Sequence, residues 1–449
     1  MGKYFGTDGF RGEANKTLTF EHAIKIGRFL GWYYGANQGK KAKIVIGKDT
    51  RRSSYMFEYA LASGITASGG DAYIMHVTTT PSVSYISRTE NFDCGIMISA
   101  SHNAFHDNGI KFFGGDGYKL PDAVEDELEK IVRTIENGDA LYRANGSEIG
   151  TLEYHHELLN DYIDFVAGTT EERFDGVKVV LDCANGAAYE AMPAVLRRLG
   201  AELIVMNDAP DGSNINSGCG STHLEALQKR VVEEKADFGI AHDGDADRCL
   251  CVDEKGQVID GDHILMMCAL EMMKKGTLKD NTVVTTVMAN IGFHKAVKEA
   301  GGRTEVTKVG DRYVLENMLA NGYKLGGEQS GHIIFSDFST TGDGLITGLQ
   351  VLSSVKRSGK KASELSGLMT SYPQLLVNVR VKTKEGWEQN AAIAEAIKKG
   401  NEELGSEGRI LVRPSGTEPL IRVMAEGQDT KQLEVICNSI AEVVAREQQ

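Results

Sequence analysis

Three aspartates alternate with other residues in the segment HDGDADR (242–248), which follows the apolar run ADFGIA (236–241). Like charges at this spacing repel one another unless a cation offsets them. Carboxylate oxygens are also the ligands that hard divalent cations prefer. Asp243, Asp245 and Asp247 therefore predict a metal site, with a solvated acidic turn as the alternative.

The composition of this acidic loop favours one kind of metal. An EF-hand calcium loop needs glycine at its sixth position, where this chain has Arg248. Three protein carboxylates leave coordination positions for water or for a phosphate oxygen. The loop therefore favours Mg²⁺ in phosphoryl transfer over a calcium cage.

A second reactive turn, SASHN (99–103), follows the strand-like run CGIMI (94–98). Ser101 in such a turn could act as a nucleophile or carry a phosphate, if a metal neutralises the phosphate and a base handles protons. The surrounding sequence is not G-x-S-x-G, which disfavours a hydrolase nucleophile elbow. A local turn or helix-capping role is the alternative.

Two further segments combine glycine with polar side chains. RPSGTEPLIR (413–422) offers two guanidinium groups, two hydroxyls and an open backbone to a phosphate dianion, or it is an ordinary hairpin turn. GGEQSGH (326–332) offers Glu328 and Ser330 to sugar hydroxyls and His332 to proton transfer, or it is a glycine-rich turn without function.

Regular elements must position these segments. Four runs rich in β-branched residues end in a polar turn and lead into helix-like sequence, at residues 42–54, 177–188, 236–248 and 281–292. This recurrence predicts α/β units with largely parallel sheets, in which ligands gather at the carboxyl ends of strands. After about Ala362 the order becomes strand, helix, two strands about a turn and helix, which predicts a small α+β domain. The expected domains are 1–150, 151–255, 256–370 and 371–449.

Charge and hydropathy restrict the partners. The formal net charge of −14 over 449 residues repels polyanions, so we expect no nucleic-acid partner, although a small phosphorylated ligand remains compatible. No apolar run is long enough for a membrane helix and the first residues lack an apolar signal, so we expect a cytoplasmic protein without a membrane partner. The seven cysteines, mostly in apolar surroundings, are expected to be reduced core residues.

In content and order, the four chemical segments resemble the α-D-phosphohexomutases: SASHN, DGDADR, GEQSGH and RPSGTEP. The resemblance implies four domains around a central cleft, three similar α/β domains and a smaller α+β C-terminal domain. MGKYFGTDGFRG, DNGIKFF, KVGDRYV, Gln329 and the length most resemble the members that act on glucosamine phosphates. Members acting on glucose or mannose phosphates are the alternative.

The resemblance also assigns roles to single residues. It implies a phosphoserine at Ser101, which would share Mg²⁺ with Asp243, Asp245 and Asp247. Proton transfer would fall to Lys111 and His332, with His102 and Arg248 near the transferring phosphoryl group. The expected substrate-binding residues are Arg11, Gly310, Asp311, Glu328, Ser330, Arg413, Ser415, Gly416, Thr417 and Arg422. The chain departs from the family pattern at Ala104, where proline is usual.

The implied reaction interconverts glucosamine 6-phosphate and glucosamine 1-phosphate. Glucosamine 1,6-bisphosphate, or another hexose bisphosphate, would serve as intermediate or activator, and a homodimer is expected from the resemblance. A metal-dependent phosphatase that hydrolyses the phosphoserine and a catalytically silent sugar-phosphate sensor are the rival functions. Against the sensor, such a protein would not need Ser101, the three aspartates and Lys111 together.

Overall fold

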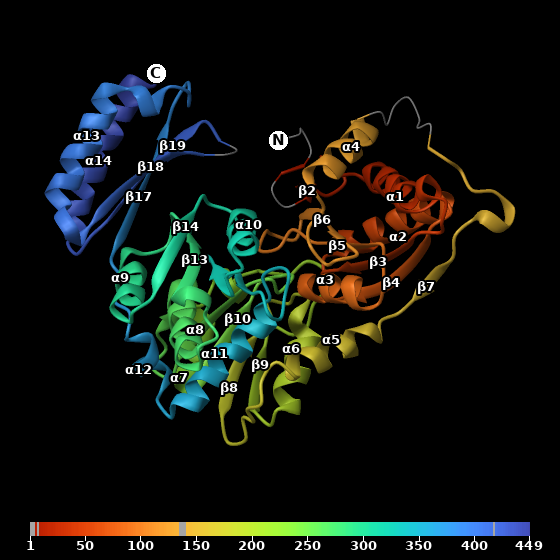
Figure 1. Ribbon diagram of the computed structural model, residues 1–449, viewed down its shortest axis with the longest axis horizontal. Helices are drawn as coiled ribbons and strands as arrows, with labels where there is room; N and C mark the ends of the chain where they lie inside the picture. The colour runs from red at the N-terminus through yellow and green to blue at the C-terminus, as the bar shows by residue number, and fades with distance from the viewer. Residues whose placement is uncertain (1–4, 7–8, 134–140, 416–417) are drawn as a thin grey trace. The chain divides into compact units, whose positions relative to one another are not determined.

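The computed structural model describes residues 5–6, 9–133, 141–415 and 418–449. The chain forms two compact units (Figure 1). The larger unit comprises Met1–Met288 and Gly302–Gly367, and the smaller unit comprises Ala289–Gly301 and Leu368–Gln449.

The first sheet of the larger unit has seven strands in the order β1-β2-β6-β5-β3-β4-β7. Its central strands β3, β4, β5 and β7 are parallel to their neighbours in that group. The strands are β1 (Phe5–Gly6), β2 (Gly9–Glu13), β3 (Lys43–Lys48), β4 (Asp71–Val77), β5 (Cys94–Ile98), β6 (Asp107–Gly114) and β7 (Leu152–Tyr154), and the helices are α1 (Phe20–Tyr34), α2 (Arg52–Ala67), α3 (Thr80–Thr89) and α4 (Asp122–Arg133).

The side chains of β3 alternate between the two faces of this first sheet. Because both faces carry apolar side chains, helices cover both of them. Ile44 and Ile46 pack into the core that α1 and α2 close, whereas Val45 packs into the core on the side of α3. A strand buried on both faces is fixed in register, so its carboxyl end holds the residues that follow it in a defined place.

The second sheet has five strands in the order β12-β11-β10-β8-β9. Its elements are β8 (Lys178–Asp182), β9 (Glu202–Met206), β10 (Phe238–His242), β11 (Cys249–Asp253) and β12 (Val258–Ile259), with α5 (Leu158–Ala167), α6 (Ala188–Arg198) and α7 (Glu225–Glu233). The prediction that a helix follows the run 236–248 is wrong, because β10 turns back into the antiparallel strand β11. The five residues of β11, CLCVD, are all buried, so this apolar stretch completes the sheet.

The third sheet has the order β14-β13-β15-β16. Its elements are β13 (Thr282–Thr286), β14 (Arg303–Thr307), β15 (Leu325–Gly327) and β16 (Ile333–Phe335), with α8 (Gly261–Lys275), α10 (Asp311–Asn321), α11 (Gly344–Ser358) and α12 (Ala362–Ser366). The antiparallel pair β15 and β16 carries residues 328–332 at its turn. The segment singled out for sugar binding is therefore a hairpin loop.

The N-terminus of α11 supports the acidic loop between β10 and β11. Asp343 caps the helix by accepting a hydrogen bond from the Ile346 amide at 2.9 Å, and the buried Tyr162 hydroxyl donates to Asp343 at 2.8 Å. The next amide, that of Gly344, donates to the Ala246 carbonyl at 2.9 Å. Helix cap and acidic loop are thus held together through main-chain atoms.

The smaller unit is the α+β domain expected from the end of the sequence. Its sheet is antiparallel in the order β17-β19-β18, with β17 (Gln374–Arg380), β18 (Arg409–Pro414) and β19 (Leu420–Glu426). Helices α13 (Ala391–Leu404) and α14 (Thr430–Glu447) belong to it, and α9 (Ile291–Glu299) lies within its chain range. A core of its own, with Ile421, Val423 and Ile436 fully or nearly buried, explains why it is a separate unit.

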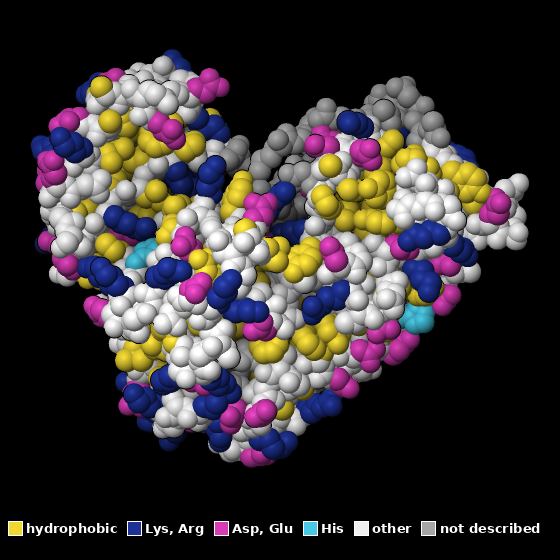
Figure 2. Space-filling model, in the orientation of Figure 1, with side chains coloured by type: hydrophobic (Ala, Val, Ile, Leu, Met, Phe, Trp, Pro, Cys, Tyr) yellow, Lys and Arg dark blue, Asp and Glu magenta, His cyan; other side chains and the backbone are white. Residues whose placement is uncertain are grey.

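The distribution of surface charges and the burial of the cysteines are typical of a folded globular chain. On the visible face of each unit, acidic and basic side chains are interspersed rather than gathered by sign (Figure 2). All seven cysteines are free and buried, as expected. Within the described residues, no helix combines the length and apolar character needed to cross a membrane.

Candidate active site

The acidic loop between β10 and β11 gathers three carboxylates inside the larger unit. Asp243 and Asp245 are fully buried and Asp247 is 6% exposed. One carboxylate oxygen from each lies within 4.8 Å of the others. The strand β10 delivers the first of them directly at its carboxyl end, and the hairpin return into β11 keeps all three in one place.

Neighbouring cations compensate part of this charge. The Lys111 ammonium lies 2.8 Å from Asp245 and 3.3 Å from Asp247. Burial alone would raise the pKa of Asp247, but Lys111 and His332 hold it well below its usual range. Burial, together with the charges of Asp247 and Asp245, raises the pKa of Asp243 to about 8. The negative charge of the cluster is therefore not fully balanced by neighbouring positive charge at Asp243.

The triad fits an oxygen-preferring divalent cation. Among the described residues, Asp245 Oδ1 and Asp247 Oδ1 are buried without a hydrogen-bond partner. Buried polar atoms are almost always satisfied, so these oxygens indicate an absent ligand. Three converging carboxylates with space for further oxygens suit a Mg²⁺-type ion.

Ser101 meets the acidic loop although 142 residues separate it from Asp243 in the chain. It follows the buried strand β5 and donates a hydrogen bond from Oγ to Asp243 Oδ2 at 2.6 Å. Its φ of 52° lies in the left-handed region, which non-glycine residues adopt at a cost that is common at functional sites. The predicted phosphate carrier and the predicted metal site therefore form one site.

Close backbone contact also joins these two loops. A Cβ at Gly244 would lie 2.5 Å from the Ser101 carbonyl oxygen and 2.9 Å from Asn216 Nδ2. Real Cβ atoms essentially never approach other atoms under 3.0 Å. Glycine at position 244 is thus required for Ser101 to reach Asp243.

His102 and Arg248 flank the serine in different charge states. Burial and the charges of Arg248 and Arg11 lower the pKa of His102 to about 4, so the ring is neutral near pH 7. Although burial opposes its charge, Asp243 and Asp247 raise the pKa of Arg248, which stays cationic. Its Nε is buried and has no hydrogen-bond partner among the described residues, so it can donate to a phosphate. Arg11 lies on β2, opposite Gly109 in the neighbouring strand.

His332 stands between two carboxylates at the end of the β15–β16 hairpin. Its Nδ1 lies 3.8 Å from Asp247 and its Nε2 lies 3.5 Å from Asp311. Burial opposes the charged ring, but Asp247 and Asp311 raise the pKa of His332, while the Gly342 amide donates to Nε2 at 3.1 Å and favours the neutral ring. These opposed influences suit a group that exchanges protons. A cavity of about 170 Å³ opens against both His332 and Asp311.

The remaining sugar-loop residues are linked to the loop before α10. The Gly310 amide donates to Glu328 Oε1 at 3.1 Å, and Gly310 has a φ of 130° that favours glycine. Ser330 Oγ is buried without a hydrogen-bond partner among the described residues. Gln329 donates to Asp260 at 3.1 Å, and Asp260 in turn caps α8.

In the smaller unit, the two predicted phosphate-binding arginines are direct neighbours. Arg413 on β18 pairs in register with Arg422 on β19. Burial and the charge of Arg422 lower the pKa of Arg413, since like charges facing each other across strands are unfavourable. Ser415 is buried, and its carbonyl accepts a hydrogen bond from Lys384 at 2.7 Å. Gly416 and Thr417 lie outside the described residues.

Three side chains that the sequence alone does not single out also contact the site. Thr80 donates from Oγ1 to Asp245 at 2.5 Å, whereas Arg51 and Asn216 bond to main-chain carbonyls of the Ser101 loop. Arg51 and Thr80 follow the parallel strands β3 and β4, and the carboxyl ends of such strands are where ligand sites form. That position was the available signal for both residues. No comparable signal marks Asn216.

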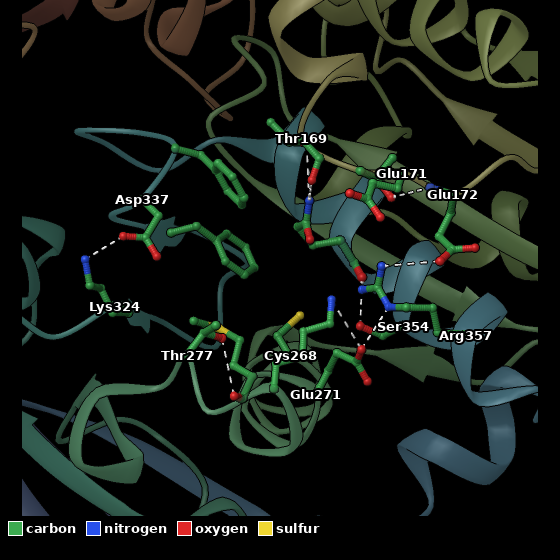
Figure 3. A pocket seen from close by; sticks show the side chains of 16 residues that line it. Thr169, Glu171, Glu172, Cys268, Glu271, Thr277, Lys324, Asp337, Ser354 and Arg357 are labelled. Atoms are coloured by element: carbon green, nitrogen blue, oxygen red, sulfur yellow. Dashed lines mark hydrogen bonds and ion pairs between the residues drawn. The ribbon is translucent and has the colours of Figure 1, made fainter.

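A larger cavity of about 440 Å³ lies elsewhere in the larger unit, and none of the predicted site residues lines it. Its walls come from residues 169–172, α8, the end of β16 and α11 (Figure 3). Several of its charged groups are paired: Arg357 lies 2.8 Å from Glu271, and Lys324 lies 2.5 Å from Asp337. We assign this cavity no part in the chemistry at Ser101.

Four models of the phosphoglucomutase/phosphomannomutase family match the chain in order. They are the alpha/beta/alpha domains I (residues 2–139), II (160–256) and III (260–372) and the C-terminal domain (376–443).

Curated relatives match over the full chain. A phosphoglucosamine mutase of Lachnospira eligens is 54% identical over 99% of this chain and 98% of its own. A second, of Brevibacillus brevis, is 52% identical over 100% of both chains.

Solved structures share the fold. A phosphoglucomutase/phosphomannomutase family protein from Burkholderia thailandensis has a TM-score of 0.80 at 23% identity, over 98% of this chain and 97% of that chain. The N-acetylphosphoglucosamine mutase of Aspergillus fumigatus, solved with GlcNAc-6P and magnesium, has a TM-score of 0.71 at 18% identity, over 99% and 96%. With all four domains matched in order and half of its residues shared with full-length relatives, this chain belongs to the phosphoglucomutase/phosphomannomutase family.

Proposed function

We propose that this protein is a phosphoglucosamine mutase, an isomerase that interconverts glucosamine 6-phosphate and glucosamine 1-phosphate through a phosphoserine at Ser101. The observation that carries the proposal is the 2.6 Å hydrogen bond from Ser101 Oγ to Asp243, within a buried acidic triad. The choice of glucosamine over other hexoses is supported by the full-length relatives that share half of its residues.

In the first half-reaction, the phosphoryl group leaves the Ser101 oxygen and bonds to O1 of glucosamine 6-phosphate. The O1 proton passes to the chain, and glucosamine 1,6-bisphosphate results. After the bisphosphate turns end for end, its 6-phosphoryl group returns to Ser101 and the O6 oxygen regains a proton. We assign proton transfer to Lys111 and His332, which both lie against Asp247.

Charge stabilisation comes from groups already fixed around Ser101. Arg248 stays cationic and has an N–H to donate, and neutral His102 lies 3.3 Å from Ser101 Oγ. Mg²⁺ held by Asp243, Asp245 and Asp247 would offset negative charge on the transferring phosphoryl group. Preorganised charge of this kind is the main source of rate enhancement in phosphoryl transfer.

Further residues are proposed to bind substrate. Glu328 and Ser330 are proposed to bind sugar hydroxyls, and Arg11, Gly310 and Asp311 of the same unit are proposed to bind substrate as well. Arg413, Ser415 and Arg422 are proposed to bind the phosphate that does not react, because two facing arginines are relieved by a dianion. A homodimer and a cytoplasmic location stay predictions.

Replacing Ser101 by alanine removes the oxygen that carries the phosphate. We expect Ser101→Ala to lower mutase kcat by at least about 10³-fold, as loss of a covalent nucleophile does. Incubation with glucose 1,6-bisphosphate followed by intact-mass spectrometry should add one phosphate to the parent protein and none to the variant. The exposed Ser63 on α2 supplies the control, Ser63→Ala. Equal phosphate incorporation in Ser101→Ala would contradict the assignment.

Removing the cation should abolish turnover reversibly. EDTA should stop the reaction and excess Mg²⁺ should restore it, because the triad is under-compensated without a cation. In calorimetric titration of the metal-free protein, Asp245→Asn should weaken Mg²⁺ binding by at least about tenfold, since it removes one of three charged ligands. Asp208→Asn, at an exposed position, is the control. Unchanged Mg²⁺ affinity in Asp245→Asn would place the metal elsewhere.

The paired arginines of the smaller unit can be tested separately. Arg422→Ala should raise KM for glucosamine 6-phosphate by about tenfold or more, because a charge-assisted contact to phosphate contributes on the order of 1.5–3 kcal/mol. Arg380→Ala, at an exposed position of β17, should leave KM unchanged. Steady-state kinetics that show the same KM and kcat/KM for Arg422→Ala and the parent would remove Arg422 from the phosphate site.

A further inference from the structure

The carbonyl groups of residues 101–107 converge on one buried guanidinium. Arg51 is fully buried, and its Nη2 donates to the Ser101 carbonyl at 2.9 Å and to the Asn103 carbonyl at 2.8 Å. Its Nη1 donates to the carbonyls of Asp107, at 3.2 Å, and Ala104. One side chain thus holds four points of the loop that carries the phosphate.

No N–H group of Arg51 is left for a substrate phosphate. A guanidinium has five N–H donors in a fixed plane. Four bond to the loop carbonyls, and Nε donates to Asp49 at 2.8 Å. Asp49 is itself held by hydroxyl groups, accepting from Ser54 at 2.9 Å and from Ser99 at 2.7 Å. Arg51 is therefore fixed on both sides and acts on the loop instead of on a ligand.

A second donor reaches the same carbonyls from another segment. Asn216, which follows β9 in the chain and is 7% exposed, donates from Nδ2 to the Ser101 carbonyl at 2.9 Å and to the Asn103 carbonyl at 3.0 Å. The main-chain N–H of Asn216 donates to the Ala184 carbonyl at 2.9 Å, so the main chain at Asn216 is anchored beside the end of β8. Arg51 and Asn216 therefore hold one pair of carbonyls from two segments that follow strands of different sheets, β3 and β9.

These bonds act on a strained residue. Ser101 has a left-handed φ of 52°, and its carbonyl also lies against Gly244. A strained conformation persists only where its surroundings determine it fully. The hydrogen bonds from Arg51 and Asn216 fix this conformation, in which Ser101 Oγ lies 2.6 Å from Asp243. Both donors also bind the Asn103 carbonyl, and Arg51 binds the Ala104 carbonyl beside it.

We propose that Arg51 and Asn216 are positioning residues for phosphoryl transfer, which fix the phosphate-carrying serine against the acidic triad through shared main-chain carbonyls. The inference rests on the proposed function. Because both residues act on the enzyme's own loop, they govern the rate of transfer and leave substrate affinity nearly unchanged. A misplacement of about 1 Å in a reacting group can cost about 10²-fold in rate.

The test compares Arg51→Lys and Asn216→Ala with matched controls. Lysine keeps the charge beside Asp49, but one ammonium cannot span four carbonyls, and alanine removes both Asn216 bonds. Each variant should lower kcat by about 10- to 100-fold and keep KM within about twofold. Arg52→Lys, at the next and exposed position, and Asn214→Ala, whose side chain donates to Ala209 in its own loop, should keep parental kcat.

The double variant separates positioning from general destabilisation. Both donors bind the Ser101 and Asn103 carbonyls, so their effects on kcat are expected to overlap. The fold-decrease in kcat of the double variant Arg51→Lys with Asn216→Ala should therefore be smaller than the product of the fold-decreases of the two single variants. Arg51→Lys with Asn214→Ala should show only the Arg51→Lys loss. Circular dichroism and thermal unfolding verify folding, and if Arg51→Lys does not fold, Asn216→Ala carries the test alone.

Two results would overturn the inference. One is a kcat within about twofold of the parent in folded Asn216→Ala, and the other is a loss confined to KM. A parent protein without mutase activity in the same assay would count against the proposed function itself. An active parent with equally active variants would count only against the positioning role.

Discussion

Three carboxylates sharing one buried space is the constraint on which the rest of this structure depends. Burial disfavours each charge, and each charge disfavours its neighbours, so the cluster is tolerable only with close cations. Lys111 pairs with one oxygen each of Asp245 and Asp247, and the raised pKa of Asp243 shows where positive charge is still missing. A divalent cation and a phosphate-bearing Ser101 would complete the cluster at that place.

The fold makes this cluster by bringing strand ends together. β10 ends at the acidic loop and β5 ends at the Ser101 loop, and the Gly344 amide at the start of α11 donates to the acidic loop. The two loops can approach this closely only because residue 244 is glycine, since a Cβ there would collide with the Ser101 carbonyl oxygen. Catalysis by phosphoryl transfer depends largely on such positioning, and here it is set mostly by main-chain atoms.

Much of this arrangement could be predicted from the sequence because its signals are local. Alternating aspartates after an apolar run, a serine turn after a strand and the change of pattern near Ala362 each lie within a few residues. The contacts of Thr80, Arg51 and Asn216 could not be predicted in this way, since each joins residues that lie 50 or more positions apart in the chain. The helix expected after the acidic loop was wrong, because a hairpin return and a helix can both follow a polar turn.

The central claim is that this site transfers a phosphoryl group on glucosamine phosphates. The most direct measurement is a coupled assay of the purified, Mg²⁺-supplied protein with a trace of hexose 1,6-bisphosphate, comparing glucosamine 6-phosphate with glucose and mannose 6-phosphates. We expect kcat/KM to be clearly highest for glucosamine 6-phosphate. Equal or higher values for glucose or mannose 6-phosphate would contradict it.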